Sequence, residues 1–270
     1  MKILLNNFDL NEALKKDHNI GFVPTMGSIH EGHVSLVKRS KKESKKTLVS
    51  IFINPKQFNN KKDYKNYPKN IKKDLRILKR LKVDFIYIPQ IIDVFNKEKK
   101  QRYRLNKKDK ILCAKYRPGH FEGVLEVMDR LTHLIKPKKI FMGEKDYQQL
   151  FLLKRYIEKK YKSKIIGCKT IRDKNNLALS SRNLLLNKKQ LILASKVIQR
   201  SIKFKKSLDS TKNIKKLLNF ESKKMQKIFK IKIEYFELRN KKNLLLSKKV
   251  NNSRIFIAYY INKIRLIDNF

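Results

Sequence analysis

The sequence predicts an α/β protein with two domains: a Rossmann-like parallel sheet domain over residues 1–171, and a smaller α+β C-terminal domain over residues 172–270. In the first two-thirds of the chain, short apolar runs alternate with amphipathic helical patterns, which is typical of a parallel sheet covered by helices on both faces. After Ile171 the order changes to two long Lys-rich helical patterns and then adjacent alternating segments. That order favours a small domain with an antiparallel sheet.

The elements of the first domain follow from the positions of its apolar runs. Strands are expected at Ile20–Val23, Leu48–Ile53, Phe85–Ile88, Ile140–Met142 and Ile165–Cys168. Helices are expected at Val34–Lys42, Asn70–Lys82, Phe121–Ile135 and Tyr147–Lys160. The helix over 121–135 is the clearest, since its apolar residues fall on one face. Ligands of such sheets bind outside the carboxyl ends of the strands, so we examine the segments that follow each strand.

The second domain is expected to contain helices at Lys188–Lys206 and Thr211–Phe229. Its strands are expected at Ile231–Leu238, Arg254–Ile261 and Ile264–Ile267.

Length and composition narrow the function classes. The chain has 270 residues, 41% of them hydrophobic, which excludes a wholly disordered chain and permits a real core. No apolar run reaches the length of a membrane span, and the block Ile3–Leu5 is too short for a secretion signal. We therefore expect a cytoplasmic protein without a membrane partner. Cys113 and Cys168 form no metal-ligand pattern, so they are expected to be reduced and no metal site is predicted.

The formal net charge of +45 has two interpretations. Such a charge is typical of nucleic-acid-binding surfaces. However, the lysines are spread along the whole chain and accompany abundant Asn and Ile with no Trp, which indicates compositional drift of exposed positions. We favour drift and expect no specific nucleic-acid partner.

The segment Pro24–His33 directly follows the first expected strand and reads as a turn with glycine, then a helix that starts at or just before His33. A helix N-terminus carries unpaired N–H groups and a partial positive charge, so it suits phosphate. His30 and His33, three residues apart, can face that position together. The alternative is that both histidines only cap or pack the start of the helix.

Four further segments have polar side chains where strands end or helices begin. Asn54–Phe58 places Asn54 and Gln57 after a strand that Pro55 stops, although an ordinary polar loop explains it equally. In Gly143–Gln149, the glycine lets a ligand approach the backbone closely and Lys145 can neutralise phosphate. Asp146 can accept hydrogen bonds from ribose hydroxyls and cap the helix.

The remaining two segments are Arg117–Gly123 and Leu179–Asn183. Arg117 and His120 open the clearest helix and suit anion contact, or simply a helix-start turn. In Leu179–Asn183, two serine hydroxyls and a guanidinium can bind polyphosphate oxygens. The alternative is that this segment is only a capped loop.

Taken together, these segments resemble the pantoate–β-alanine ligase family, a group of HxGH nucleotidyltransferases with a Rossmann-like sheet. The matching stretches run nearly end to end in the family's order: Phe22–Val37, Ser50–Phe58, Tyr67-Pro68, Arg117–Gly123, Phe141–Leu150, Ile171–Asn183 and Arg265–Asn269. The chain departs from the family at Leu179, where Met is usual, and at Asn175-Asn176, where Asp-Gly is usual. Asn tolerates the left-handed conformation that Gly would provide.

The resemblance implies an ATP-dependent ligase that joins (R)-pantoate to β-alanine through a pantoyl adenylate and releases AMP and pyrophosphate. It also implies Mg²⁺ bound with ATP, a homodimer, and a C-terminal domain that acts as a lid.

By the same resemblance, His33, His30 and Lys145 are the expected catalytic residues. His33 would be the proton donor, or would instead mainly stabilise charge, and Lys145 would stabilise the developing charge. Gln57 and Gln149 would bind pantoate, and Gln57 would also border β-alanine. ATP contacts are implied for Met26, Gly27, Ser28, Ile29, His30, Glu31, Gly32, His33, Gly143, Glu144, Lys145, Asp146, Ile171, Leu179, Ser180, Ser181 and Arg182.

Two competing readings remain. A related nucleotidyltransferase acting on another small substrate would share the His-x-Gly-His turn. A nucleic-acid-binding protein driven by the +45 charge would show steeply salt-dependent binding and no ATP turnover.

Overall fold

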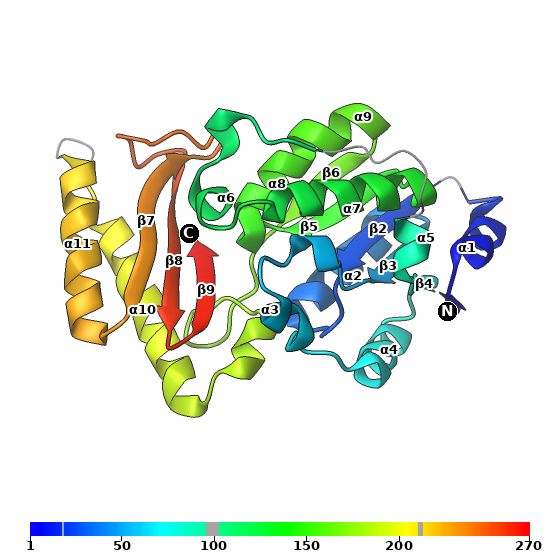
Figure 1. Cartoon of the computed structure of the whole chain (residues 1–270), viewed down its shortest axis with the longest axis horizontal. Coiled ribbons are helices and arrows are strands. Elements are labelled where there is room, and N and C mark those ends of the chain that lie inside the picture. The colour runs from blue at the N-terminus through cyan, green and yellow to red at the C-terminus, as the bar shows by residue number, and fades with distance from the viewer. Residues whose placement is uncertain (18, 96–102, 210–212) are drawn as a thin grey trace. The chain divides into compact units, whose positions relative to one another are not determined.

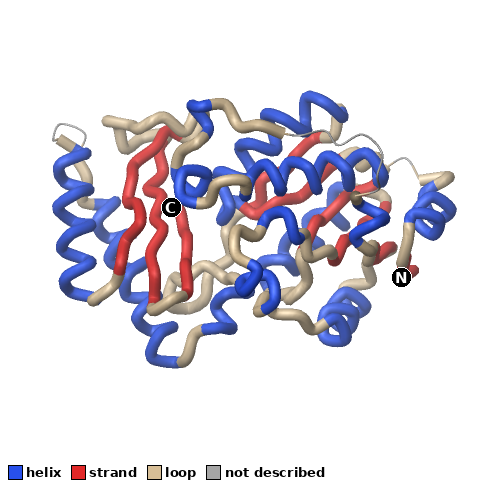
Figure 2. The backbone as a smooth tube through the Cα atoms, viewed as in Figure 1, coloured by secondary structure: helices blue, strands red, loops and turns tan. Residues whose placement is uncertain are grey.

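Two structural units make up the chain in the computed structural model, Met1–Lys169 and Thr170–Phe270. The structure describes residues 1–17, 19–95, 103–209 and 213–270. Figure 1 labels the elements, and Figure 2 shows that strands and helices contribute to each unit.

The first unit contains a six-stranded sheet in the order β1-β4-β3-β2-β5-β6, and all its neighbouring strands are parallel. The strands are β1 (Lys2–Leu4), β2 (Ile20–Thr25), β3 (Lys46–Ile51), β4 (Phe85–Tyr87), β5 (Lys139–Gly143) and β6 (Lys164–Cys168). The chain leaves β2 toward β3 on one side and later adds β5 and β6 on the other. The strand order therefore reverses between β2 and β5.

Helices connect these strands. They are α1 (Asn7–Leu14), α2 (Glu31–Glu43), α3 (Lys61–Lys65), α4 (Ile71–Arg80), α5 (Ile91–Val94), α6 (Leu112–Tyr116), α7 (His120–Ile135), α8 (Tyr147–Leu153) and α9 (Lys159–Tyr161). Short 3-10 turns are η1 (Pro55–Gln57), η2 (Lys107–Asp109) and η3 (Glu144–Asp146), and the π-helical turn η4 (Lys154–Glu158) joins α8 to α9. Within the described residues, no helix is long and apolar enough to cross a membrane.

Side chains on both faces of the sheet are buried. Val23, Val49 and Phe141 pack with Leu36 of α2 and Leu78 of α4 in one cluster. The alternate residues along the strands are also fully buried, namely Phe22, Leu48, Tyr87 and Ile140. Because successive strand side chains point to opposite faces, both faces of the sheet must be covered by other parts of the protein. Figure 1 shows α7 lying across the front of the sheet.

The second unit contains η5 (Ser181–Leu185), α10 (Lys188–Lys206), α11 (Ile214–Phe229) and the antiparallel sheet β7-β8-β9. Its strands are β7 (Lys232–Asn240), β8 (Ser253–Ile261) and β9 (Ile264–Asn269). Its core joins apolar side chains of both helices to the sheet: Ala194, Val197, Ile198, Leu218, Met225, Phe236, Ile257 and Tyr259. Figure 2 shows the three strands beside these helices.

The predicted fold class is confirmed, and every predicted strand and helix appears with its ends shifted by a few residues. The expected start of α11 at Thr211 lies outside the described residues. The helix expected over 147–160 is divided by the π-helical turn. The predictions missed β1 and the short helices α1, α3, α5 and α6. The strand was missed because the apolar block Ile3–Leu5 is too short to indicate one. Both cysteines are free and buried, as expected for reduced thiols.

Helix α7 packs unusually closely on the turn η1. A Cβ placed on Gly123 would lie 2.3 Å from the backbone oxygen of Lys56 and 2.6 Å from its carbonyl carbon. Asn54 Nδ2 donates to the Gly123 oxygen at 3.0 Å across the same contact. Only a residue without a side chain fits here without moving backbone.

We therefore expect Gly123→Ala to destabilise the protein, even though alanine favours an isolated helix by about 1 kcal/mol. The backbone clash should lower the free energy of unfolding by roughly 1–3 kcal/mol, measured by urea denaturation. Gly143→Ala is the control, since a Cβ there meets no atom within 4 Å. Equal stability of the two variants would contradict the packing described.

Candidate functional site

The candidate site lies where the strand order reverses, at the carboxyl ends of β2 and β5. Ligands of open α/β sheets bind at such switch points. Met26–His33 follows β2, and Gly143–Gln149 begins with the last residue of β5. The topology therefore brings two of the predicted segments to one edge of the sheet.

The turn after β2 is held by a carboxylate from a different part of the chain. Asp74 of α4 is only 2% exposed, and its two oxygens accept hydrogen bonds from the backbone amides of Ser28 at 2.8 Å and Ile29 at 2.7 Å. Gly27 and Ser28 have φ values of 78° and 54°, the left-handed region that glycine adopts without cost. The buried carboxylate stabilises this bent backbone.

Helix α2 begins at Glu31 with His30 as its N-cap, in agreement with the expected start at or just before His33. The Nδ1 atom of His30 accepts from the Gly32 amide at 3.1 Å, and Nδ1 of His33 accepts from the His30 amide at 3.4 Å. An imidazole that accepts through Nδ1 carries its proton on Nε2 when it is neutral. Both rings therefore present an Nε2–H donor.

These bonds change the expected phosphate seat. The amides of Ser28, Ile29, His30 and Gly32 have acceptors within the protein, and the Gly27 amide donates to Thr25 Oγ1 at 3.1 Å. The prediction that unpaired amides form the seat is wrong for these five groups.

The two imidazoles lie close together with their planes tilted by 36°, and charges in the segment after β5 shift their pKa values. Their ring centroids lie 4.1 Å apart. Burial, followed by the charge of Lys145, lowers the pKa of His30 to about 4. Burial, with smaller effects from His30 and Lys145, lowers the pKa of His33 to about 3, although Asp146 opposes the shift. Both rings are thus neutral at pH 7.

Lys145 is the cation of this group. Its side chain is 18% exposed, and its Nζ lies 3.5 Å from Oδ1 of Asp146. The structure therefore brings together four predicted residues, His30, His33, Lys145 and Asp146.

Gln57 joins the same group from the turn after β3. Its Nε2 donates to the sulfur of Met26 at 3.0 Å, and its Oε1 accepts from Asn54 Nδ2 at 3.1 Å. Asn54 is buried and also bonds the Gly123 oxygen of α7. The amide of Gln57 is thus oriented from both sides beside the turn after β2.

Arg117 and His120 hold the backbone of Gln57. Nδ1 of His120 donates to the Gln57 oxygen at 2.6 Å, and an Arg117 guanidinium nitrogen donates to the same oxygen at 3.2 Å. The other guanidinium nitrogen lies 2.9 Å from Nε2 of His120. Of the two interpretations offered for this segment, these contacts favour the structural one.

The segment after β5 differs from expectation at one residue. Asp146 occupies the N-cap position of α8, but its side chain makes no capping hydrogen bond, so the predicted capping role is wrong. Its carboxylate is 48% exposed. Gln148 is buried and donates to the backbone oxygens of Ile111 and Asp109. Gln149, the predicted ligand, is half-buried.

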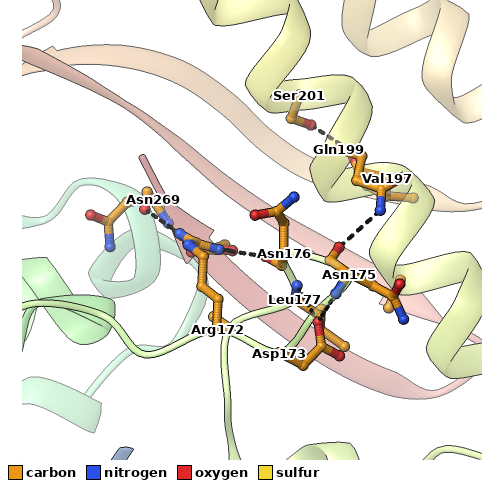
Figure 3. Close-up of polar contacts among 12 residues, drawn as sticks. Arg172, Asp173, Asn175, Asn176, Leu177, Val197, Gln199, Ser201 and Asn269 are labelled. Atoms are coloured by element: carbon orange, nitrogen blue, oxygen red, sulfur yellow. Dashed lines mark hydrogen bonds and ion pairs between the residues drawn. The ribbon is translucent and has the colours of Figure 1, made fainter.

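The predicted residues Ile171 and Leu179–Arg182 belong to the second unit. The Leu179 amide donates to the Ile171 oxygen at 3.0 Å, and Ser180 caps η5 by accepting from the Arg182 amide at 3.3 Å. Asn176 has φ 68°, which confirms that asparagine takes the left-handed position usual for glycine. Figure 3 shows the loop that leads into this segment.

Asp74 is the residue that sequence reasoning missed. It lay within the expected helix over 70–82, whose apolar face includes Ile71, Leu75 and Leu78. An acidic residue at i+3 from Ile71 and i−4 from Leu78 lies on that face, where an unpaired charge is costly. An acidic residue on this apolar face was therefore the sequence signal that Asp74 is buried and bonded to a partner elsewhere in the chain.

Comparison with known proteins extends over the whole chain. The sequence model of the family described as Pantoate-beta-alanine ligase matches residues 4–270. A pantothenate synthetase from Francisella philomiragia is 40% identical over 268 residues, covering 97% of this chain and 92% of the relative. One from Pseudothermotoga lettingae is 37% identical over 275 residues, covering 99% and 98%.

Solved structures agree with the sequence relatives. The pantothenate synthetase of Thermus thermophilus superposes with a TM-score of 0.92 at 29% identity, covering 100% of this chain and 99% of that one. The pantoate-beta-alanine ligase of Francisella tularensis, solved in complex with beta-gamma ATP and beta-alanine, gives a TM-score of 0.84 at 37% identity, covering 100% and 97%. With matches in sequence and fold along nearly its entire length, this chain belongs to the pantoate-beta-alanine ligase family.

Proposed function

We propose that this chain joins (R)-pantoate to β-alanine with ATP as co-substrate, giving pantothenate, AMP and pyrophosphate. The observation that carries the proposal is the group at the switch point, where two Nε2–H imidazoles lie beside Lys145 and the Gln57 amide is held against Met26 of the same turn. Cationic and neutral donors beside a carboxamide suit a reaction between a phosphate and a hydroxy acid. Family membership and the complex of the Francisella tularensis relative support the same substrates.

In the first half-reaction, a pantoate carboxylate oxygen attacks the α-phosphorus of ATP, and the bond to pyrophosphate breaks. The product is pantoyl adenylate. Negative charge grows on the phosphoryl oxygens and on the leaving pyrophosphate, so donors fixed in advance lower the barrier. Lys145, His30 and His33 supply one positive charge and two neutral N–H donors for this purpose.

The protonation state of the His33 imidazole decides how it acts in this step. A group with a pKa of about 3 holds almost no proton to give at pH 7. His33 therefore stabilises the developing charge as a neutral donor and does not transfer a proton. Its partner His30 acts in the same way, and its Nδ1 also fixes the start of α2.

The second half-reaction uses the activated acyl group. The amine of β-alanine attacks the carbonyl carbon of pantoyl adenylate, AMP leaves, and the amine loses a proton as the amide forms. Gln57 and Gln149 bind pantoate through its hydroxyl and carboxylate oxygens, and Gln57 also borders β-alanine. Their amides offer both donors and acceptors, which a hydroxy acid requires.

ATP contacts are proposed for the segments Met26–His33 and Gly143–Asp146, with Asp146 on the ribose. In the second unit, we assign Ile171 to adenine and Leu179–Arg182 to the triphosphate, by resemblance. Mg²⁺ arrives with ATP and offsets phosphate charge. A lid role for the second domain and a homodimer also rest on resemblance. We further propose a domain boundary near residue 171, where the sequence pattern changes, and a cytoplasmic location.

The decisive assay measures AMP formation by the purified protein with MgATP, (R)-pantoate and β-alanine. AMP should form only when both organic substrates are present. AMP release with another acid or amine alone would favour a related nucleotidyltransferase, and absence of turnover with salt-sensitive polyanion binding would favour the nucleic-acid alternative.

We expect His33→Ala to slow adenylation by about two orders of magnitude, the usual effect of losing one fixed donor. The measurement is pantoate-dependent exchange of labelled pyrophosphate into ATP. His133→Ala is the control, since His133 is exposed on α7. Unchanged exchange in the His33 variant would remove His33 from the mechanism.

The pH dependence separates a neutral donor from an acid. An imidazolium with an ordinary pKa of about 6.5 loses its proton as pH rises, whereas His33, with a pKa of about 3, is already neutral. The exchange rate of the parent divided by that of His33→Gln should stay constant from pH 6 to pH 8, because titrations of the substrates cancel in the ratio. A ratio that falls through about pH 6.5 would show proton donation by His33.

Gln149→Ala should raise the KM for pantoate by about tenfold or more, as expected for a lost hydrogen bond to a charged ligand. Gln148→Ala is the matched control. It removes the bonds to Ile111 and Asp109 and should lower Tm without changing that KM. Equal pantoate KM values in the two variants would count against Gln149 as a ligand.

A further inference from the structure

A hairpin precedes the segment Leu179–Arg182 in the second unit, and it is closed by its own polar contacts. Arg172 and Ala178 form an antiparallel bridge, and the Asp173 amide donates to the Leu177 oxygen at 2.9 Å. The Asp173 carboxylate accepts from the amides of Asn175 at 2.8 Å and Leu177 at 2.9 Å. These residues form a defined turn, as Figure 3 shows.

Arg172 attaches this hairpin to the end of β9. Its guanidinium makes a bidentate pair with Asp268, at 2.6 Å and 2.9 Å. The same group donates to the backbone oxygens of Asn176 at 2.9 Å and Asn269 at 3.1 Å. Three hydrogen bonds from one rigid fork thus reach the last strand of the sheet, while a fourth holds the turn at Asn176.

The Asp268 carboxylate depends on this partner. Asp268 is 4% exposed and also accepts from the Asn269 amide at 2.7 Å. A buried carboxylate without its cation carries a large desolvation penalty. The pair therefore resists any displacement of the hairpin away from β9.

A second contact holds the tip of the hairpin. Gln199 of α10 donates from Nε2 to the Asn175 oxygen at 3.0 Å, visible in Figure 3. The hairpin is fixed to the sheet at one point and to a helix at another.

The hairpin in turn positions the serine–arginine segment. Asn183 Nδ2 donates to the Ala178 oxygen at 3.1 Å, and the Asn183 amide donates to the Ser180 oxygen at 3.0 Å. Ser180 also caps the Arg182 amide. Because the turn from Ala178 to Asn183 is short and internally bonded, movement of the hairpin shifts Ser180 and Arg182 with it.

We propose that Arg172 and Asp268 are a positioning pair that sets ATP affinity by fixing the segment Leu179–Arg182, without touching substrate themselves. This inference rests on the proposed function, in which that segment binds the triphosphate. Misplacement of a binding group by about 1 Å can cost up to about a hundredfold, so loss of the pair should be visible in ATP binding.

The test compares Asp268→Asn with Glu221→Gln. Glu221 is a matched control because it also makes a bidentate pair, at 2.6 Å and 3.2 Å with Arg200, but this pair joins α10 to α11. Both variants should lose a comparable amount of Tm. Titration calorimetry with MgATP should give a Kd at least about tenfold higher for Asp268→Asn and an unchanged Kd for Glu221→Gln, while the KM for pantoate stays the same in both.

Two milder variants keep the test decisive if Asp268→Asn does not fold. Arg172→Lys retains the charge without the fork, and Gln199→Ala removes only the tip contact. Both should weaken MgATP binding with a smaller loss of Tm. If Arg172→Lys, Gln199→Ala and Asp268→Asn all bind MgATP with the same Kd as Glu221→Gln, the inference is overturned. If the parent binds MgATP but forms no AMP with both substrates, the proposed function fails. The MgATP Kd values of the variants still show whether Arg172 and Asp268 set ATP affinity.

Discussion

The hydrogen bonds of the buried Asp74 carboxylate are the constraint on which the rest of the site depends. A carboxylate inside a protein must be paired or fully hydrogen-bonded, and Asp74 meets this need with the amides of Ser28 and Ile29. The turn therefore takes one path between β2 and α2, with two residues in the left-handed region. That path puts His30 at the N-cap and His33 one turn later, where each Nδ1 accepts an amide.

In the proposed function this site binds anions through side chains, because five backbone amides of the turn already have acceptors within the protein. Each imidazole keeps Nδ1 for the backbone and presents Nε2–H outward, and burial beside Lys145 keeps both rings neutral. In the proposed reaction, one cation and two neutral donors would offset the growing phosphate charge without placing several buried cations together, which is costly. Gln57 is held by a separate set of contacts from α7.

Much of this organisation could be predicted from the sequence, because periodicity and strand-end motifs are local signals. The alternation of strands and helices and the segments after β2, β3 and β5 follow from such signals. Contacts between residues that are distant in sequence do not follow from local signals. Nothing near Ser28 indicates that Asp74 occupies its amide, and nothing near Gln57 indicates that Arg117 and His120 hold its carbonyl. The missing capping bond of Asp146 was also unpredictable, because a capping residue type identifies a position without fixing its rotamer.

The tautomers of His30 and His33 test the central claim most directly. Nitrogen NMR of histidine-labelled protein distinguishes an unprotonated Nδ1 from a protonated Nε2 in each ring. At pH 5, where an ordinary histidine with a pKa of about 6.5 is charged, both rings should remain neutral with the proton on Nε2. Rings that are doubly protonated at pH 5, or that carry the proton on Nδ1 at pH 7, would contradict the claim that both act as neutral Nε2–H donors.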